Sequence, residues 1–140
     1  MTQEQNYKNH ARLHPLFHFI GTPLALITFI GAIVYLFTSF SWISVLSVIA
    51  SICIMVCIIL VRTYATKLQD RIIRNEENFR HYLLTGEPLN SRLTTGQIVA
   101  LRFASDDQFP ELCRKAVNES LKPDDIKKAV KIWRADSLRV

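Results

Sequence analysis

Charged residues are missing from one long part of the sequence. Between Leu16 and Val61 there is no Lys, Arg, Asp or Glu, although charged residues make up 21% of the chain. A soluble core does not gather its apolar residues into one such block, whereas two membrane-spanning helices do. The absence therefore excludes an ordinary soluble domain for residues 16–61 and predicts a membrane element there.

Cysteine and glycine are also scarce, and both shortages exclude classes of site. Cys53, Cys57 and Cys113 form no CxxC motif and no even set for disulfides, so they argue neither for an oxidising compartment nor for a thiolate metal centre. The four glycines form no phosphate-binding loop. The sequence also offers no nucleophile–base pair. We therefore expect a protein that is not an enzyme and binds no cofactor.

Two apolar runs fill the uncharged stretch. They cover approximately residues 16–37 and 42–61, and at about 1.5 Å per residue each helix would be about 30 Å long, the thickness of the hydrocarbon layer. The short connection at residues 38–41 makes the helices antiparallel neighbours in the lipid bilayer. The first run is too long for the core of a cleaved signal peptide. Pro23 predicts a kink near the start of the first helix.

Basic residues flank this hairpin but are missing from its connection. The nearest are Lys8 and Arg12 before the first run, and Arg62, Lys67, Arg71 and Arg74 after the second. Because loops rich in Lys and Arg stay in the cytoplasm, both termini are predicted to be cytoplasmic. Residues 1–15 would then form a cytoplasmic N-terminal segment.

Small residues recur on one face of each predicted span. They are Gly21, Ala25, Thr28 and Ala32 on the first, and Ser44, Ser47 and Ser51 on the second. Such faces let two helix backbones approach closely, and their hydroxyls can bond across the interface. Packing within the hairpin is the simpler interpretation. The alternative is a polar path for a solute between several copies of the chain.

Three histidines precede the first apolar run or lie at its start. His10, His14 and His18 are spaced four residues apart, which on one helix would suit a metal or a haem. Pro15 interrupts that arrangement, because the residue before a proline is pushed out of the helical region. Zinc would also need further ligands that the neighbouring sequence lacks. We therefore favour polar anchors at the membrane surface over a metal site.

The second run is expected to continue as a cytoplasmic helix over residues 62–85. Neither Gly nor Pro occurs there, and a coiled-coil-like repeat of three and four residues runs along it. Its members are Ala65, Leu68, Ile72, Asn75, Phe79 and Tyr82. Either this face packs on the C-terminal helices of the same chain, or two copies associate through Leu68, Ile72 and Phe79.

Residues 86–140 are expected to form a small domain of three short helices after a linker rich in Gly, Pro, Asn and Ser. Thr94 and Gln97 form a capping box for a helix that ends near residue 104. Ser105 would cap a second helix, which ends near residue 120. Pro123 would open a third, which ends near residue 134.

The apolar positions of these helices would form a small core. They are Ile98, Leu101, Phe109, Leu112, Val117, Ile126, Val130 and Trp133. A core of this size is marginal for a free domain, so docking on the preceding helix or on the membrane is expected.

The third predicted helix also has a basic face. Lys127, Lys131 and Arg134 line one side of it and would contact an anionic leaflet or simply face solvent. Three short helices with a basic third one are similar to a helix-turn-helix. The modest formal charge of +5 for the whole chain and the missing turn glycine argue against nucleic-acid binding.

Several blocks of the sequence are similar to a known family. QNYKNHARLHPLFHF near the N-terminus, KLQDRIIRNEE after the second apolar run and ALRFASD in the C-terminal part resemble small bacterial two-pass membrane proteins that form a domain of unknown function. The resemblance covers essentially the whole chain and implies a bacterial inner-membrane protein. It supplies no reaction, cofactor or partner.

The sequence therefore predicts an all-α protein with a two-helix transmembrane hairpin, a continuing cytoplasmic helix and a small C-terminal helical bundle. We expect a membrane-anchored adaptor or scaffold that presents this bundle to a protein partner or to the leaflet. A homo-oligomeric channel or transporter component is the first alternative. A metal- or haem-binding redox subunit, which would depend on the three histidines alone, is the second.

Overall fold

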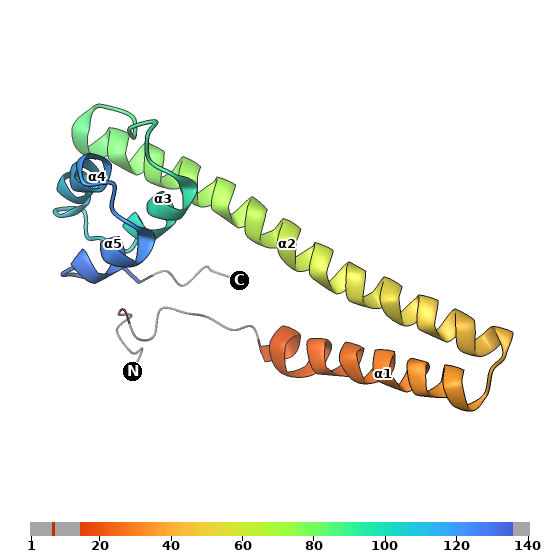
Figure 1. The fold of residues 1–140 in the computed structure, drawn as a ribbon. Coiled ribbons are helices and arrows are strands. Elements are labelled where there is room, and N and C mark those ends of the chain that lie inside the picture. Colours follow the sequence, from red (N-terminus) through yellow and green to blue (C-terminus); the bar gives the residue numbers. More distant parts are fainter. Residues whose placement is uncertain (1–6, 8–14, 136–140) are drawn as a thin grey trace. The chain divides into compact units, whose positions relative to one another are not determined.

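The computed structural model describes Tyr7 and residues 15–135, and these are arranged as helices (Figure 1). The elements in chain order are the π-helix η1 (Leu16–Gly21) and the α-helices α1 (Thr22–Thr38), α2 (Trp42–Thr85), α3 (Thr95–Leu101), α4 (Phe109–Asn118) and α5 (Pro123–Ala129). Among the described residues there is no strand, only an isolated bridge between Ala104 and Trp133. The predicted all-α fold is confirmed.

The chain divides into two compact units, and α2 runs through both of them. Residues 15–66 belong to the first unit, whereas Tyr7 and residues 67–135 belong to the second. The last part of α2 belongs to the same unit as the C-terminal helices, because those helices are docked on it.

The first unit is a helical hairpin. Its two helices, Leu16–Thr38 and Trp42–Thr85, are long and apolar enough to cross a membrane by length and composition. Three residues join them at one end. Near the other end the Arg62 guanidinium lies 5.5 Å from the centre of the Phe17 ring. The two helices are therefore antiparallel neighbours, as Figure 1 shows.

The irregularity expected at Pro23 takes the form of a wide turn just before it. Proline has no N–H for the helical hydrogen bond, and the preceding residues adopt the π-helix η1. There the backbone N–H of Thr22 reaches back five residues to the carbonyl of Phe17. The Thr22 hydroxyl donates to the same carbonyl at 2.9 Å. The π-helix therefore leads directly into α1, with Pro23 in its first turn.

The hairpin buries small residues and exposes large ones. Ala25 and Ala32 of α1 are each 8% exposed, and Ser44 and Ser51 of α2 are 0% and 2% exposed. By contrast, Phe37 is 85% exposed. Apolar side chains of this size stay in water only at a large cost in free energy, so this surface is suited to lipid.

The second unit has the opposite arrangement, with its large apolar residues inside. The predicted core is confirmed: seven of its eight residues are buried, and Trp133 packs against them. Leu93, Ala100, Ala104, Cys113 and Ala116 complete it. The capping box of α3 is also present, with Thr94 accepting from the N–H of Gln97 and Gln97 accepting from the N–H of Thr94.

Three helix boundaries differ from those predicted. α3 ends at Leu101 and not near residue 104. Ser105 does not cap α4, which begins at Phe109 after Gln108; instead the carbonyl of Ser105 accepts the N–H groups of Gln108 and Phe109. The third helix ends at Ala129 and not near residue 134. It ends there because the Gln108 side chain binds the carbonyl of Ala129 and the N–H of Lys131, which holds the chain in an extended conformation.

Candidate functional site

An arginine joins the last part of α2 to the C-terminal helices. Arg80 donates to Glu77 one turn earlier at 2.9 Å, and to the carboxylate of Asp106 at 2.7 Å. It also donates to the carbonyl of Ala104 at 2.7 Å. Its guanidinium lies over the ring of Phe109, 4.3 Å from the ring centre. We call Glu77, Arg80 and Asp106 the ionic cluster.

The ionic cluster is largely removed from water on the α2 side. The side chains of Arg80 and Glu77 are 11% and 8% exposed, whereas that of Asp106 is 66% exposed. Arg134 approaches the second oxygen of Glu77 at 3.9 Å. A buried charge is tolerated only when it is paired and hydrogen-bonded. The ionic cluster therefore fixes the C-terminal helices on one face of α2.

Burial raises the pKa of two groups at this junction. The pKa of Glu77 is raised from its ordinary value because burial disfavours the carboxylate, although Arg80 opposes the effect. Burial and then the nearby Glu77 carboxylate raise the pKa of the Cys113 thiol to about 12. A thiol this difficult to ionise is a poor nucleophile. The properties of these two groups therefore fit a structural junction between α2 and the C-terminal helices.

His81 also belongs to this junction. Glu77 pairs with Arg80, whereas Nδ1 of His81 lies 2.7 Å from the carbonyl of Glu87 in the turn after α2. The His81 ring meets the Phe109 ring edge-on at 6.0 Å. Its role is to hold the turn against α4.

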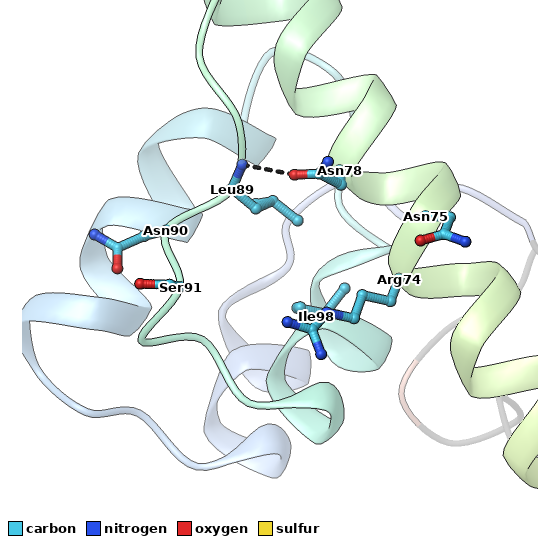
Figure 2. Close-up of a pocket in the computed structure, with 7 residues that line it drawn as sticks. All are labelled: Arg74, Asn75, Asn78, Leu89, Asn90, Ser91 and Ile98. Carbon is cyan, nitrogen blue, oxygen red and sulfur yellow. Dashed lines mark hydrogen bonds between the residues drawn. The ribbon is translucent and has the colours of Figure 1, made fainter.

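A small pocket opens between α2 and the segment that leads into α3 (Figure 2). Its volume is about 160 Å³. It is lined by Arg74, Asn75, Asn78, Leu89, Asn90, Ser91 and Ile98. We call it the asparagine pocket. All seven residues belong to the second unit, so the pocket is part of one compact body.

The asparagine pocket offers mainly hydrogen-bond donors. The side-chain oxygen of Asn78 already accepts the N–H of Leu89 at 2.9 Å, drawn as a dashed line in Figure 2. The oxygen of Asn90 likewise accepts the N–H of Arg92 at 2.9 Å. Within the described part of the chain neither amide NH₂ group donates a hydrogen bond, and Figure 2 shows the Asn90 amide directed away from α2. With the Arg74 guanidinium, this lining suits a carboxylate or a phosphate.

The opposite face of α2 carries apolar side chains that the second unit leaves exposed. Leu68 is 58% exposed, Ile72 49%, Phe79 63% and Tyr82 54%. We call these four residues the apolar stripe. The alternative in which this face packs on the C-terminal helices of the same chain is therefore wrong. Those helices cover Ile73 and Glu77, which are each 6% exposed.

The residues predicted to pack the hairpin lie in different environments. Ala25, Ala32, Ser44 and Ser51 are buried, Gly21 and Ser47 are half-buried, and Thr28 is exposed. The hydroxyls bond within their own helix or its N-terminal turn and not across the interface: Thr28 donates to Leu24, Ser44 to Ser41, Ser47 to Ile43 and Ser51 to Val48. A polar path between several copies of the chain stays a prediction.

The histidines and the basic residues give no assembled site in the described part of the chain. His10 and His14 lie outside the described residues, and His18 packs edge-on against Phe17 with 5.0 Å between ring centres. Because α5 ends at Ala129, Lys131 and Arg134 lie beyond it and do not share a helix face with Lys127. Contact of these three residues with a leaflet stays a prediction.

Sequence reasoning missed the ionic cluster and the asparagine pocket. Arg80 and Asp106 are 26 residues apart, and no local pattern connects them. The pocket likewise combines polar residues of α2 with polar residues of a linker. The spacing of three residues between Glu77 and Arg80 was an available signal for that part of the ionic cluster.

Comparison with known proteins places the chain in a family without assigning it an activity. No curated protein and no solved structure matches it. A family model does match, over residues 1–140. The chain belongs to DUF6526, a family of unknown function.

Proposed function

We propose that this chain is a non-enzymatic adaptor anchored in the bacterial inner membrane, with both termini in the cytoplasm. The hairpin is the anchor. The second unit is the part that meets a protein partner. The basic residues that flank the hairpin support the cytoplasmic orientation of both ends.

The distribution of apolar side chains supports the anchor. In the hairpin, small residues are buried and large apolar residues are exposed. In an aqueous environment this arrangement would leave Ile, Leu and Phe side chains unburied along both helices. A hydrocarbon environment removes that cost and rewards close approach of small residues.

The observation that carries the adaptor proposal is the asparagine pocket on a fixed scaffold. The ionic cluster and the buried core hold α3, α4 and α5 on α2, so the two walls of the pocket keep their spacing. Pre-organised donors bind a partner with less ordering cost than donors on mobile loops. An acidic side chain, a C-terminal carboxylate or a phosphorylated residue of a protein partner would satisfy them.

The test is photo-crosslinking in native membranes. A photoreactive amino acid replaces Asn90 in the full-length protein, and crosslinked species are identified by mass spectrometry. We expect one protein partner at a stoichiometric level. Arg74→Glu should reduce that product at least about tenfold, because it places a negative charge where the partner's anion binds.

Lys115→Glu is the matched control, since Lys115 is an exposed basic residue of α4 and is not part of the pocket. It should leave the crosslink within about twofold of the unmodified protein. Crosslinks to lipid alone, or equal crosslinking in both variants, would contradict the proposal.

A further inference from the structure

Within the part of the chain that the structure describes, no element covers the apolar stripe. The charged residues beside the stripe indicate what binds it. The C-terminal helices occupy the other side of α2, where Ile73 and Glu77 are buried. The stripe residues therefore remain accessible after the second unit has assembled. An exposed line of large side chains outside the apolar hairpin is typical of an interaction surface.

We propose that the apolar stripe binds the same stripe of a second copy of this chain, so that two α2 helices form a short parallel coiled coil. In heptad notation Ile72 and Phe79 occupy position a, and Leu68 and Tyr82 occupy position d. Asn75, which also lines the asparagine pocket, falls on the d position between them, so the proposed interface borders that pocket. The pattern is regular from residue 68 to residue 82, all within the second unit.

Charge complementarity selects a second copy in parallel orientation. Arg71 occupies position g and Glu76 occupies the e position five residues later. In a parallel pair each g residue faces the e residue of the following heptad in the partner. Arg71 of each copy would therefore face the partner's Glu76, giving two equivalent ion pairs. Among the described residues, neither side chain forms an ion pair within its own chain.

An antiparallel pair would lose this match, because it brings g positions together and e positions together. Arg71 would then meet another g residue, and Glu76 another e residue. The preference for the parallel arrangement also agrees with the anchor: two copies in one membrane send their α2 helices out on the same side. This part of the inference rests on the proposed function.

The same anchor explains how so short a coiled coil could associate. Two heptads are too few for a stable coiled coil between free peptides in water. Two chains confined to one membrane meet at a raised effective concentration, which converts weak contacts into a populated dimer. The dimer would hold two asparagine pockets at a fixed separation.

Disulfide trapping of the full-length protein in liposomes tests the interface. Cys53 and Cys57 are first replaced by alanine, while the buried Cys113 is kept. Single cysteines are then placed by Ile72→Cys or Phe79→Cys in the stripe, and by Lys67→Cys at an exposed position c outside it. Facing a positions come close enough for a disulfide, so both stripe cysteines should give at least about tenfold more crosslinked dimer than the control.

Charge reversal provides a second test, which addresses the register of the two helices. In the Ile72→Cys background, Arg71→Glu or Glu76→Arg alone should lower the trapped dimer about threefold or more. The double reversal should return it to within about twofold. Arg71, Ile72 and Glu76 are all exposed, so circular dichroism and melting of the variants should match those of the parent.

The possible results distinguish failure of the dimer proposal from failure of the membrane-anchor proposal. In one outcome the protein resists extraction from the membrane at alkaline pH, but all three cysteines give equal amounts of crosslinked dimer. This result would overturn the dimer proposal and leave the adaptor proposal standing. Protein that is extracted yet still shows stripe-specific trapping supports the dimer and removes the anchor. Single reversals that leave trapping unchanged, or a different protein crosslinked in place of the second copy, would also overturn the dimer.

Discussion

The hairpin and the second unit use the same kinds of apolar residue in opposite ways. Phe37 in the hairpin is 85% exposed, whereas Phe109 in the second unit is fully buried beneath Arg80. The buried positions are reversed as well, since the hairpin encloses Ala32 and Ser44. The apolar content of a helix alone therefore does not determine which of its side chains are buried. The surrounding medium decides which face of a helix is packed and which is left open.

The largest contrast is expected between two phenylalanines. Phe109→Ala should lower the free energy of unfolding of the second unit by about 3–5 kcal/mol, because it removes a fully buried ring and leaves a cavity. Phe37→Ala should leave that free energy unchanged within error. Urea titration of the detergent-solubilised chain, followed by the fluorescence of Trp133 in a Trp42→Phe background, measures both. Similar losses in the two variants would contradict the comparison.

The next effect concerns the ionic cluster. Arg80→Met keeps most of the side-chain volume but leaves the buried carboxylate of Glu77 without its main partner. We expect a loss of about 3–5 kcal/mol at neutral pH. Adding Glu77→Met should recover most of that loss, since an apolar pair can replace a buried ion pair. A double variant as unstable as the single one would show that charge burial is not the cause.

In the hairpin, enlarging a small residue should matter only on the packed face. Ala32→Leu inserts three carbons at a position that is 8% exposed, and should destabilise the helix pair by about 1–3 kcal/mol. Gly31→Leu is the matched control, because Gly31 is exposed and a Cβ at this position would meet nothing within 4 Å. Energy transfer between labels on the two helices, during titration with a denaturing detergent, reports their separation. Equal effects at both positions would argue against a packed face at Ala32.

A smaller effect is expected at the start of α3. Thr94→Ala removes the side chain that accepts the N–H of Gln97, and should lower the stability of the second unit by about 1 kcal/mol. Thr94→Ser keeps the oxygen and should restore most of the loss. The same urea titration detects this difference. Failure of serine to rescue would assign the effect to packing.

The pH dependence of the second unit provides the finest test. The pKa of Glu77 is raised in the folded protein above its ordinary value of 4.5. The folded state therefore holds its proton more tightly than the unfolded state, and this contribution to stability is present at low pH and lost as the pH rises through the folded pKa. Glu77→Gln should remove this loss of stability with rising pH. If wild type gained stability relative to Glu77→Gln as the pH rose above 4.5, the sign would be wrong.

Much of the fold could be predicted because it depends on local patterns. The apolar runs defined the two long helices, and 3.6-residue periodicity identified the buried positions of α3, α4 and α5. The Thr94 capping box was readable because its two members are three residues apart. These features need no information from distant parts of the chain.

The remaining features depend on contacts between distant residues. The end of α5 could not be predicted because Gln108, 21 residues before Ala129, binds its last carbonyl. Arg80 and Asp106 meet for a similar reason. One of the two alternatives also placed the C-terminal helices on the wrong face of α2. The apolar stripe seemed the better packing surface, but the helices dock on the face that carries the buried pair of Glu77 and Arg80.

The central claim is that the two units face different media, and measurement of nitroxide accessibility tests it most directly. Spin labels at Ile27 and Ile54 of the hairpin, and at Lys115 and Glu119 of the second unit, are compared in liposomes with oxygen and a water-soluble nickel complex as relaxants. We predict that oxygen dominates at the first two positions and nickel at the last two. Nickel accessibility at Ile27 and Ile54 equal to that at Lys115 and Glu119 would contradict the claim.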